Sequence, residues 1–324
     1  MKNKFLKWIG LSITSILVPL CASCGGSKSD KMDIITTIFP EYDWVMNILG
    51  EKKESANVSM LLDSGVDLHS YQPSIKDITN ISQCDLFIYV GGESDKWVDD
   101  VLKQAKNKDM LSINLMDVLG DKKKEEELIE GMQGEEDEEE EGEEEIEYDE
   151  HVWLSIKNAQ IFVKTIADSL STLDKNNADY YKSNADAYIS KLKDLDGKYE
   201  QAVNSGTQKT LLFADRFPFR YLVEDYSLKY YAAFIGCSAE TEASFETIAF
   251  LASKVDELGL KVILKIESSK GSIANTVKNA TQSKDQSILT MDSIQSATTK
   301  EYQEGRNYFS IMEKNLDVLK EAVK

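Results

Sequence analysis

The chain has 324 residues, of which 42% are hydrophobic and 29% are charged, and its formal net charge is −20 at pH 7. This length is sufficient for two lobes with separate cores. The negative charge argues against nucleic acid and anionic lipid as partners, and it is compatible with cationic ligands. The chain contains only four cysteines and two histidines, and the cysteines are too few for a disulfide framework.

The first 23 residues have the organisation of a secretory signal. Three lysines precede an apolar run, and small residues then lead to Cys24. The apolar run is too short to span a bilayer comfortably. The segment resembles the cleavage site of bacterial lipoproteins, although Cys21 stands where leucine is usual. We expect removal of residues 1–23 and lipidation of Cys24, with residues 24–32 as a tether. Cleavage to a free secreted protein is the alternative.

Short apolar runs alternate with amphipathic stretches over residues 33–121. The predicted strands are 33–39, 56–62, 85–92 and 110–115, and the predicted helices are 40–50, 74–82 and 95–105. This alternation is typical of a mainly parallel sheet whose two faces are covered by helices. We therefore predict that residues 33–121 form an N-terminal α/β lobe.

Residues 122–150 interrupt the alternation. This segment is dense in glutamate and poor in apolar residues, so it cannot bury a core and is expected to be an acidic, low-complexity, mobile loop. Two interpretations of its charge stay open. The carboxylates could form a weak trap for divalent cations, which bind hard oxygen ligands, or the segment could be a solvated spacer.

Helical periodicity returns after the acidic segment. Residues 151–174 contain a first helix, and residues 175–204 predict a long helix that connects two lobes. Alternation resumes over residues 205–324, with predicted strands at 210–215, 229–236, 262–268 and 287–293 and predicted helices at 219–226, 244–259, 273–281 and 307–324. The predicted fold class is α/β, with two lobes of parallel-type sheets joined by a single long backbone helix.

Four polar side chains lie where these elements would meet. His69 follows a predicted strand, Asp215 and Asp292 lie at the ends of two others, and His151 lies at the entry to the first helix after the acidic segment. Because ligands of open α/β sheets collect at the carboxyl ends of the strands, these four side chains could converge on the cleft between the lobes. Imidazole nitrogen and carboxylate oxygen suit zinc, manganese or iron. Each aspartate by itself could equally be a cap or a turn residue.

Two segments around the histidines resemble motifs of a known family. "GVDLHSYQPSIKDI" is similar to the Gly-x-x-x-His-x-Tyr-x-Pro-Ser segment of the zinc/manganese substrate-binding lipoproteins of bacterial ABC importers, and "DEHVWLSIKNA" is similar to their Asp-x-His-x-Trp-Leu-Ser segment. "TMDSI" resembles the late aspartate of the manganese-type members. The resemblance begins near Asp33 and continues to the C-terminus. It implies that His69, His151 and Asp292 are metal ligands in a site between the lobes.

The resemblance fails at the family's third ligand. That ligand is a histidine or glutamate five residues before a tyrosine, and the corresponding residue before Tyr221 is Arg216. A guanidinium has no free acceptor and cannot bind a metal. We predict Asp215 as the substitute, with Glu240 as the second choice and Cys237 as the third. The expected metal is zinc first and manganese second.

The function implied by the resemblance is metal import. We expect a monomeric, lipid-anchored receptor outside the cytoplasm that captures zinc or manganese and delivers it to the membrane permease of an ABC importer. No phosphate-binding loop or nucleophile elbow is present in the sequence, so we expect no enzymatic activity. The alternative is a surface adhesion or interaction lipoprotein that uses the same fold and its acidic loop.

Overall fold

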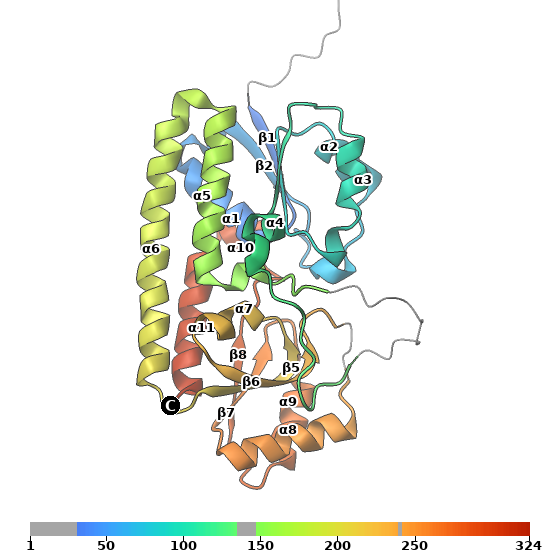
Figure 1. Ribbon diagram of the computed structural model, residues 1–324, viewed down its shortest axis with the longest axis vertical. Coiled ribbons are helices and arrows are strands. Elements are labelled where there is room, and N and C mark those ends of the chain that lie inside the picture. Colours follow the sequence, from blue (N-terminus) through green and yellow to red (C-terminus); the bar gives the residue numbers. More distant parts are fainter. Residues whose placement is uncertain (1–30, 135–146, 239–241) are drawn as a thin grey trace, which may run out of the picture. The chain divides into compact units, whose positions relative to one another are not determined.

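Figure 1 shows the computed structural model, which describes residues 31–134, 147–238 and 242–324. The predicted lipidation site Cys24 and the alternative ligand Glu240 lie outside these ranges. Within them, no helix combines the length and the apolar character needed to cross a bilayer.

The first sheet has four strands in the order β2-β1-β3-β4, and all of them are parallel. Its strands are β1 (Met32–Thr36), β2 (Ala56–Met60), β3 (Leu86–Tyr89) and β4 (Leu111–Asn114). The accompanying helices are α1 (Phe39–Leu49), α2 (Ile75–Ile81), α3 (Val98–Lys103) and α4 (Leu115–Leu119). All four residues of β3 are buried, as expected for a central strand that helices cover on both faces.

The second sheet repeats this topology in the order β6-β5-β7-β8, again with parallel strands only. Its strands are β5 (Thr210–Phe217), β6 (Lys229–Ile235), β7 (Val262–Ile266) and β8 (Ser287–Met291). Its helices are α7 (Arg220–Asp225), α8 (Phe245–Leu258), α9 (Ser272–Ala280), α10 (Thr299–Gln303) and α11 (Tyr308–Ala322). Because the two orders correspond, β2 and β6 occupy equivalent places in their sheets.

Two long helices join the sheets. These are α5 (Ile156–Leu173) and α6 (Ala178–Ser205), which lie side by side in Figure 1. The 28-residue α6 packs against α1 beside the first sheet and against α11 beside the second. Its buried face has the three- and four-residue spacing of one helix stripe: Tyr181, Ala185, Tyr188, Leu192, Leu195, Tyr199 and Val203. The predicted α/β fold with one long connecting helix is confirmed.

Short 3-10 turns complete the secondary structure. They are η1 (Gly50–Ser55), η2 (Leu68–Ser70), η3 (Glu93–Asp95), η4 (Gly120–Lys122), η5 (Val152–Leu154) and η6 (Lys175–Asn177). His69 lies within η2, and η5 directly follows His151. These short turns carry no apolar periodicity, so the sequence does not predict them.

The described ends of the acidic segment are bonded to the rest of the protein. Glu125 pairs with Tyr148 in an antiparallel bridge, and Gln133 pairs with Phe234 of β6 in a parallel bridge. Arg220 of α7 forms an ion pair with Glu127. Gln133 thus lies beside β6, the edge strand of the second sheet. Two isolated bridges and one ion pair thus hold parts of residues 122–134 and 147–150, the mobility of the loop stays a prediction, and residues 135–146 lie outside the described ranges.

Candidate metal centre

His69 lies in the loop that follows β2, within the turn η2. The carboxylate of Asp67 caps this turn, since its Oδ1 accepts a hydrogen bond from the His69 backbone N–H (3.1 Å). The imidazole Nδ1 lies 2.9 Å from Ser94 Oγ and 3.3 Å from Glu150 Oε2. Glu150 has room because Gly92, at φ 82°, has no side chain, and a Cβ there would lie 2.4 Å from Glu150 Oε1. These contacts fix the orientation of the ring.

His151 is fully buried directly before the turn η5. Its backbone N–H and its Nδ1 both contact Asp149 Oδ1, at 2.8 and 3.0 Å. On another side the ring lies against Gly236, where a Cβ would be only 2.8 Å from His151 Cε1. A glycine at the end of β6 is therefore required for the backbone of the second lobe to approach this imidazole.

The two imidazoles face each other through their Nε2 atoms, which lie 3.3 Å apart. With a metal bound, each Nδ1 would carry the hydrogen and face the carboxylate of Glu150 or Asp149, and each Nε2 would present its lone pair to the metal. Two nitrogen ligands of a tetrahedral zinc ion, at Zn–N distances of about 2.0–2.1 Å, are separated by about 3.4 Å. The pair is therefore already spaced for one metal ion.

Cys237 completes a group of three potential ligands. It follows β6, so its place in the second sheet corresponds to that of His69 in the first. One nitrogen of each imidazole and the Cys237 sulfur all lie within 4.8 Å of one another, and over the described ranges this is the one such group of histidine, cysteine and carboxylate side chains. A sulfur and a nitrogen bound to tetrahedral zinc are separated by about 3.6 Å. Binding would thus need a movement of roughly 1.2 Å at most.

Carboxylates surround the opening of this group. A cavity of about 280 Å³ is lined by Glu93, Glu126, Glu147 and Glu150 together with His69 and Cys237. Burial, followed by the charge of Glu126, raises the pKa of the Cys237 thiol well above its usual value. Burial lowers the pKa of His69, but the hydrogen bond and charge of Glu150 outweigh this effect and raise it overall. The negative surroundings favour a cation.

Asp215, the predicted third ligand, lies outside the group. The strand β5 does not end at Asp215 but continues to Phe217, past a register irregularity after Phe213. The Asp215 carboxylate accepts hydrogen bonds from the backbone N–H groups of Arg216 (2.9 Å) and Ile266 (3.4 Å). Because successive side chains of a strand point to opposite sides, Arg216 reaches the centre and Asp215 does not. As a ligand, Asp215 stays a prediction that the geometry does not favour.

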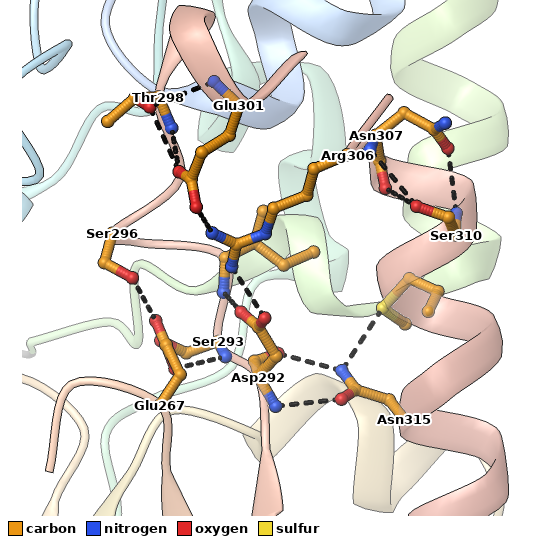
Figure 2. A network of polar contacts seen from close by, with 12 residues as sticks. Glu267, Asp292, Ser293, Ser296, Thr298, Glu301, Arg306, Asn307, Ser310 and Asn315 are labelled. Carbon is orange, nitrogen blue, oxygen red and sulfur yellow. Dashed lines mark hydrogen bonds and ion pairs between the residues drawn. The ribbon is translucent and has the colours of Figure 1, made fainter. Parts of the chain in front are cut away.

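Asp292 follows β8 as predicted, but its carboxylate is engaged by other groups. Its Oδ2 lies 2.7 Å from Arg306 Nη2, and its Oδ1 accepts from the Ile294 backbone N–H at 2.8 Å. Asn315 holds the Asp292 backbone through both its N–H and its carbonyl, at 2.8 Å each. Figure 2 shows this network. A ligand role for Asp292 also stays a prediction, and it would require the ion pair with Arg306 to break.

Arg216, the residue at the family's third-ligand position, is held by two groups from different parts of the chain. Its Nη1 lies 2.9 Å from Asp67 Oδ2 and donates to the Ser238 carbonyl at 3.3 Å. It therefore links the turn that carries His69 to the segment that carries Cys237.

Sequence reasoning missed the two carboxylates that orient the imidazoles. Asp149 and Glu150 belong to the segment that was interpreted as an acidic loop, and the only available signal was their position directly before His151. Cys237 is only the third choice of ligand from the sequence, where nothing indicates that it lies near the histidines. The signal that could have promoted it is its position directly after the strand 229–236.

Comparison with known proteins identifies relatives along the whole chain. The profile of the family described as "Zinc-uptake complex component A periplasmic" (ZnuA) matches residues 34–322. The chain is 32% identical over 329 residues to the high-affinity zinc uptake system protein ZnuA of Bacillus subtilis, covering 98% of both proteins. It is also 32% identical over 322 residues to the zinc-binding lipoprotein AdcA of Streptococcus pneumoniae, covering 98% of this chain but 61% of AdcA.

Solved structures show the same fold. The Zn(II)-bound ZnuA-like domain of Streptococcus pneumoniae AdcA matches with a TM-score of 0.70 and 30% identity, over 90% of this chain and 99% of that domain. The laminin-binding protein Lmb of Streptococcus agalactiae, described as bifunctional with adhesin and metal-transporting activity, matches with a TM-score of 0.70 over 90% of this chain and 100% of Lmb. At 22% identity, the likeness to Lmb shows the fold alone.

Proposed function

Because this chain belongs to the zinc-uptake complex component A family, we propose that it captures zinc with His69, His151 and Cys237 and delivers it to a membrane permease. It is the zinc-binding component of an ABC uptake system, and such transport binding proteins are not enzymes. Zinc is the cargo of this protein, so it is bound reversibly at the cleft between the lobes.

The spacing of the histidine nitrogens is the observation that best supports this site. Two Nε2 atoms lie 3.3 Å apart, with a separate carboxylate beside each Nδ1, and this is the separation of adjacent ligands on one zinc ion. A thiolate as the third ligand favours zinc over manganese, since manganese prefers carboxylate, carbonyl and water oxygens. We therefore infer zinc as the preferred cargo, and manganese remains the alternative.

Capture and release follow from the position of the ligands on both lobes. The lobes proposed from the sequence, residues 33–121 and 205–324, supply His69 and Cys237 respectively, and His151 comes from residues 151–174 between them. The carboxylates at the opening would concentrate the cation. Binding would deprotonate the Cys237 thiol, because a coordinating thiol loses its hydrogen. A small separation of the lobes would then withdraw one ligand and release the ion to the permease.

The location outside the cytoplasm is shared with the relatives, which are described as periplasmic or as lipoproteins. We propose in addition that Cys24 carries the lipid anchor, and mass spectrometry of the membrane-bound protein would detect the acylated N-terminal cysteine. The adhesion alternative has support only from the fold of Lmb, and it stays a prediction.

Zinc titration of the metal-free protein tests this function. We expect His69→Ala, His151→Ala and Cys237→Ser each to weaken zinc binding by at least about tenfold, because changes that do not even touch the metal commonly cost 10–100-fold. Cys84→Ala is the matched control, since Cys84 is buried beside α2 in the first lobe and contacts Met110. Tighter binding of manganese than of zinc by the wild type, or unchanged zinc affinity in either histidine variant, would contradict the proposal.

Cobalt substitution gives a second readout for the thiol. A Co(II) ion bound by a thiolate shows a sulfur-to-metal charge-transfer band in the near ultraviolet. This band should be present in the wild type and in Cys84→Ala and absent from Cys237→Ser. Its absence from the wild type would remove Cys237 from the site.

A further inference from the structure

We propose that α10 is a strap between the two lobes and that the contact between Asp63 and Thr299 is its latch, which opens when zinc leaves the cleft. The inference deepens the proposed function, on which it rests, because it assigns the control of release to residues outside the metal centre. The strap belongs to the second lobe by its place in the chain, and it is bonded to both lobes.

The latch is formed by one carboxylate and the first residue of α10. Asp63 Oδ1 accepts a hydrogen bond from the Thr299 backbone N–H at 2.6 Å, and Asp63 Oδ2 accepts one from the Thr299 hydroxyl at 2.5 Å. Asp63 lies in the loop after β2, whereas Thr299 follows β8. These two bonds therefore tie the first lobe directly to the second.

The latch is the exposed end of a longer seam between two loops. A Cβ on Gly65 would lie 3.5 Å from the Ser296 carbonyl oxygen, so the loops are in contact there. With its amide nitrogen toward Asp67, Gln295 donates to both carboxylate oxygens, at 3.0 and 3.1 Å. Every second residue of the loop before His69 thus contacts the segment after β8, and the seam holds this histidine beside the second lobe.

An aromatic contact anchors α10 on the first lobe. Tyr302 packs edge-on against Tyr42 of α1, with ring centroids 5.4 Å apart and an interplanar angle of 89°, and it also meets Phe39 with a centroid distance of 6.4 Å. Tyr42 and Phe39 are buried. Water cannot replace a contact between aromatic rings, whereas it can replace a hydrogen bond at the surface. Tyr302 is therefore the fixed attachment of the strap, and Asp63 is the exchangeable one.

On its other side, α10 is bonded to the end of β8. Arg306 follows α10 and pairs with Asp292 Oδ2 at 2.7 Å and with Glu301 Oε1 at 2.6 Å. Glu301 accepts a hydrogen bond from the Thr298 backbone N–H at 2.9 Å, and Figure 2 shows this chain of bonds from Thr298 to Asp292. Movement of Thr299 would therefore move the segment after β8 with it.

The latch is the weakest part of this arrangement because water reaches it. Asp63 is exposed and Thr299 is half-buried. Water can take over both hydrogen bonds when the latch opens, so opening has a small net cost. Separation of the seam would then withdraw His69 from Cys237 of the second lobe. A small movement at the latch is thus coupled to the loss of one ligand.

The test measures the rate at which zinc is released. We expect Asp63→Ala to release zinc about tenfold faster than the wild type, the size of effect expected for lost hydrogen bonds to a charged group. The rate of zinc association should stay near the wild-type value, because the latch closes behind a bound ion. Thr299→Val removes the hydroxyl and keeps the backbone N–H, so its increase should be smaller. Stopped-flow mixing of the zinc-loaded proteins with a fluorescent zinc chelator would measure these rates.

Ser283→Ala is the matched control. Ser283 Oγ donates to Asp285 at 2.6 Å on the surface of the second lobe, so this variant removes a similar bond outside the seam. Its release rate should equal that of the wild type. Urea unfolding would show that each variant is folded. Release at the wild-type rate from folded Asp63→Ala would overturn the latch.

Hydrogen exchange of the Thr299 backbone amide gives a second readout. This N–H is bonded to Asp63, so it exchanges slowly while the latch is closed. We expect slower exchange in the zinc-loaded wild type than in the metal-free wild type. The Tyr302 amide, which donates to the Thr298 carbonyl within the same helix at 3.0 Å, should change less. Equal exchange of the Thr299 amide in both states would show that the contact is purely structural and would reject the proposal.

The outcomes separate the latch from the proposed function. Loss of zinc binding in His69→Ala, together with unchanged release from Asp63→Ala, would overturn the latch and leave the zinc site intact. No zinc binding by the wild type would overturn both.

Discussion

Arg216 stands where the family pattern has a metal ligand. Its positive charge is paired with the carboxylate of Asp67. Its guanidinium lies against Asp67 and the Ser238 carbonyl, and the charge of Arg216, after that of His69, lowers the pKa of the Asp67 carboxyl against the opposing effect of burial. The paired guanidinium of Arg216 therefore positions the neighbouring residues and does not repel zinc. It joins the turn with His69 to the segment with Cys237, so both would move if it were removed.

We therefore predict that Arg216→Ala weakens zinc binding by about tenfold, the scale of losses for residues that orient ligands. Arg216→Lys should lose less, because an ammonium can still pair with Asp67 although it cannot reproduce the fork of a guanidinium. Isothermal titration of the metal-free variants would measure both effects. If Arg216 acted mainly by repelling the metal, Arg216→Ala would instead bind zinc more tightly, and that result would reject the present interpretation.

At the scale of single elements, α6 determines how the two lobes are joined. Its stripe of tyrosine, leucine and alanine packs against α5, α1 and α11, and Tyr199 donates a hydrogen bond to the Met312 carbonyl of α11 at 2.6 Å. The exposed face of the helix contains Gly197, and a Cβ added there would meet no atom within 4 Å. The glycine is therefore not required by packing.

Gly197→Ala should increase the free energy of unfolding by about 1 kcal/mol, because alanine loses less backbone entropy than glycine in a helix interior. Urea unfolding of the metal-free protein would measure this difference. Zinc affinity should stay at the wild-type value, since the residue is remote from the centre in the structure. A decrease in stability would show that Gly197 has a conformational role in α6 that its surroundings do not reveal.

At the scale of the whole molecule, several bonds connect the parts on either side of the cleft. Trp153 donates to Ser293, Tyr308 donates to the Trp153 carbonyl at 2.8 Å, and Thr299 bonds to Asp63 through its backbone N–H at 2.6 Å. With α6 packed on both sheets as well, wide opening would break many contacts. Small movements of the loops around His69 and Cys237 are thus the more economical way to release an ion.

Buried carboxyl groups in α1 make the stability of the whole protein depend on pH. Glu41 and Asp43 are fully buried, and burial raises the pKa of Glu41 to about 8 and that of Asp43 to about 7. Between their ordinary values near 4 and these raised values, the folded protein binds more protons than the unfolded chain. Unfolding free energy must therefore fall as pH rises from about 4.5 to about 8, by up to about 1.4 kcal/mol per pH unit for each group.

Glu41→Gln should remove the contribution of Glu41 to this decrease of the unfolding free energy with rising pH. The amide oxygen can still accept from the backbone N–H groups of Thr37 and Ile38, which Glu41 Oε2 contacts at 2.8 and 3.2 Å. Urea unfolding of the metal-free wild type and variant at pH 5, 6.5 and 8 would compare the slopes, because the titration of all other groups is common to both proteins. Equal slopes would show that Glu41 is ionised in the folded protein throughout this range.

The sequence by itself determined the elements and the order in which they alternate. The apolar run of β3 and the helical spacing of α6 are local patterns. A strand buried on both faces of a sheet has a continuous apolar run, and a helix buried along one stripe has apolar residues at three- and four-residue steps. His69 and His151 were also predicted as ligands locally, each from a short motif, and their ligand roles stay predictions. The α/β class and the long helix therefore needed no tertiary information.

Only the tertiary structure decided which side chains surround the histidines. Cys237 comes from a loop far along the chain, and its approach to the histidines depends on two sheets meeting at the carboxyl ends of their strands. The choice between Asp215 and its neighbour Arg216 depends on the side of β5 to which each side chain points, and a register irregularity in that strand leaves no local signal. The sequence predicted that Asp292 lies at the end of a strand. It did not predict the ion pair with Arg306, which depends on the packing around α10. A metal centre is assembled from such long-range contacts, whereas periodicity reports only on neighbours along the chain.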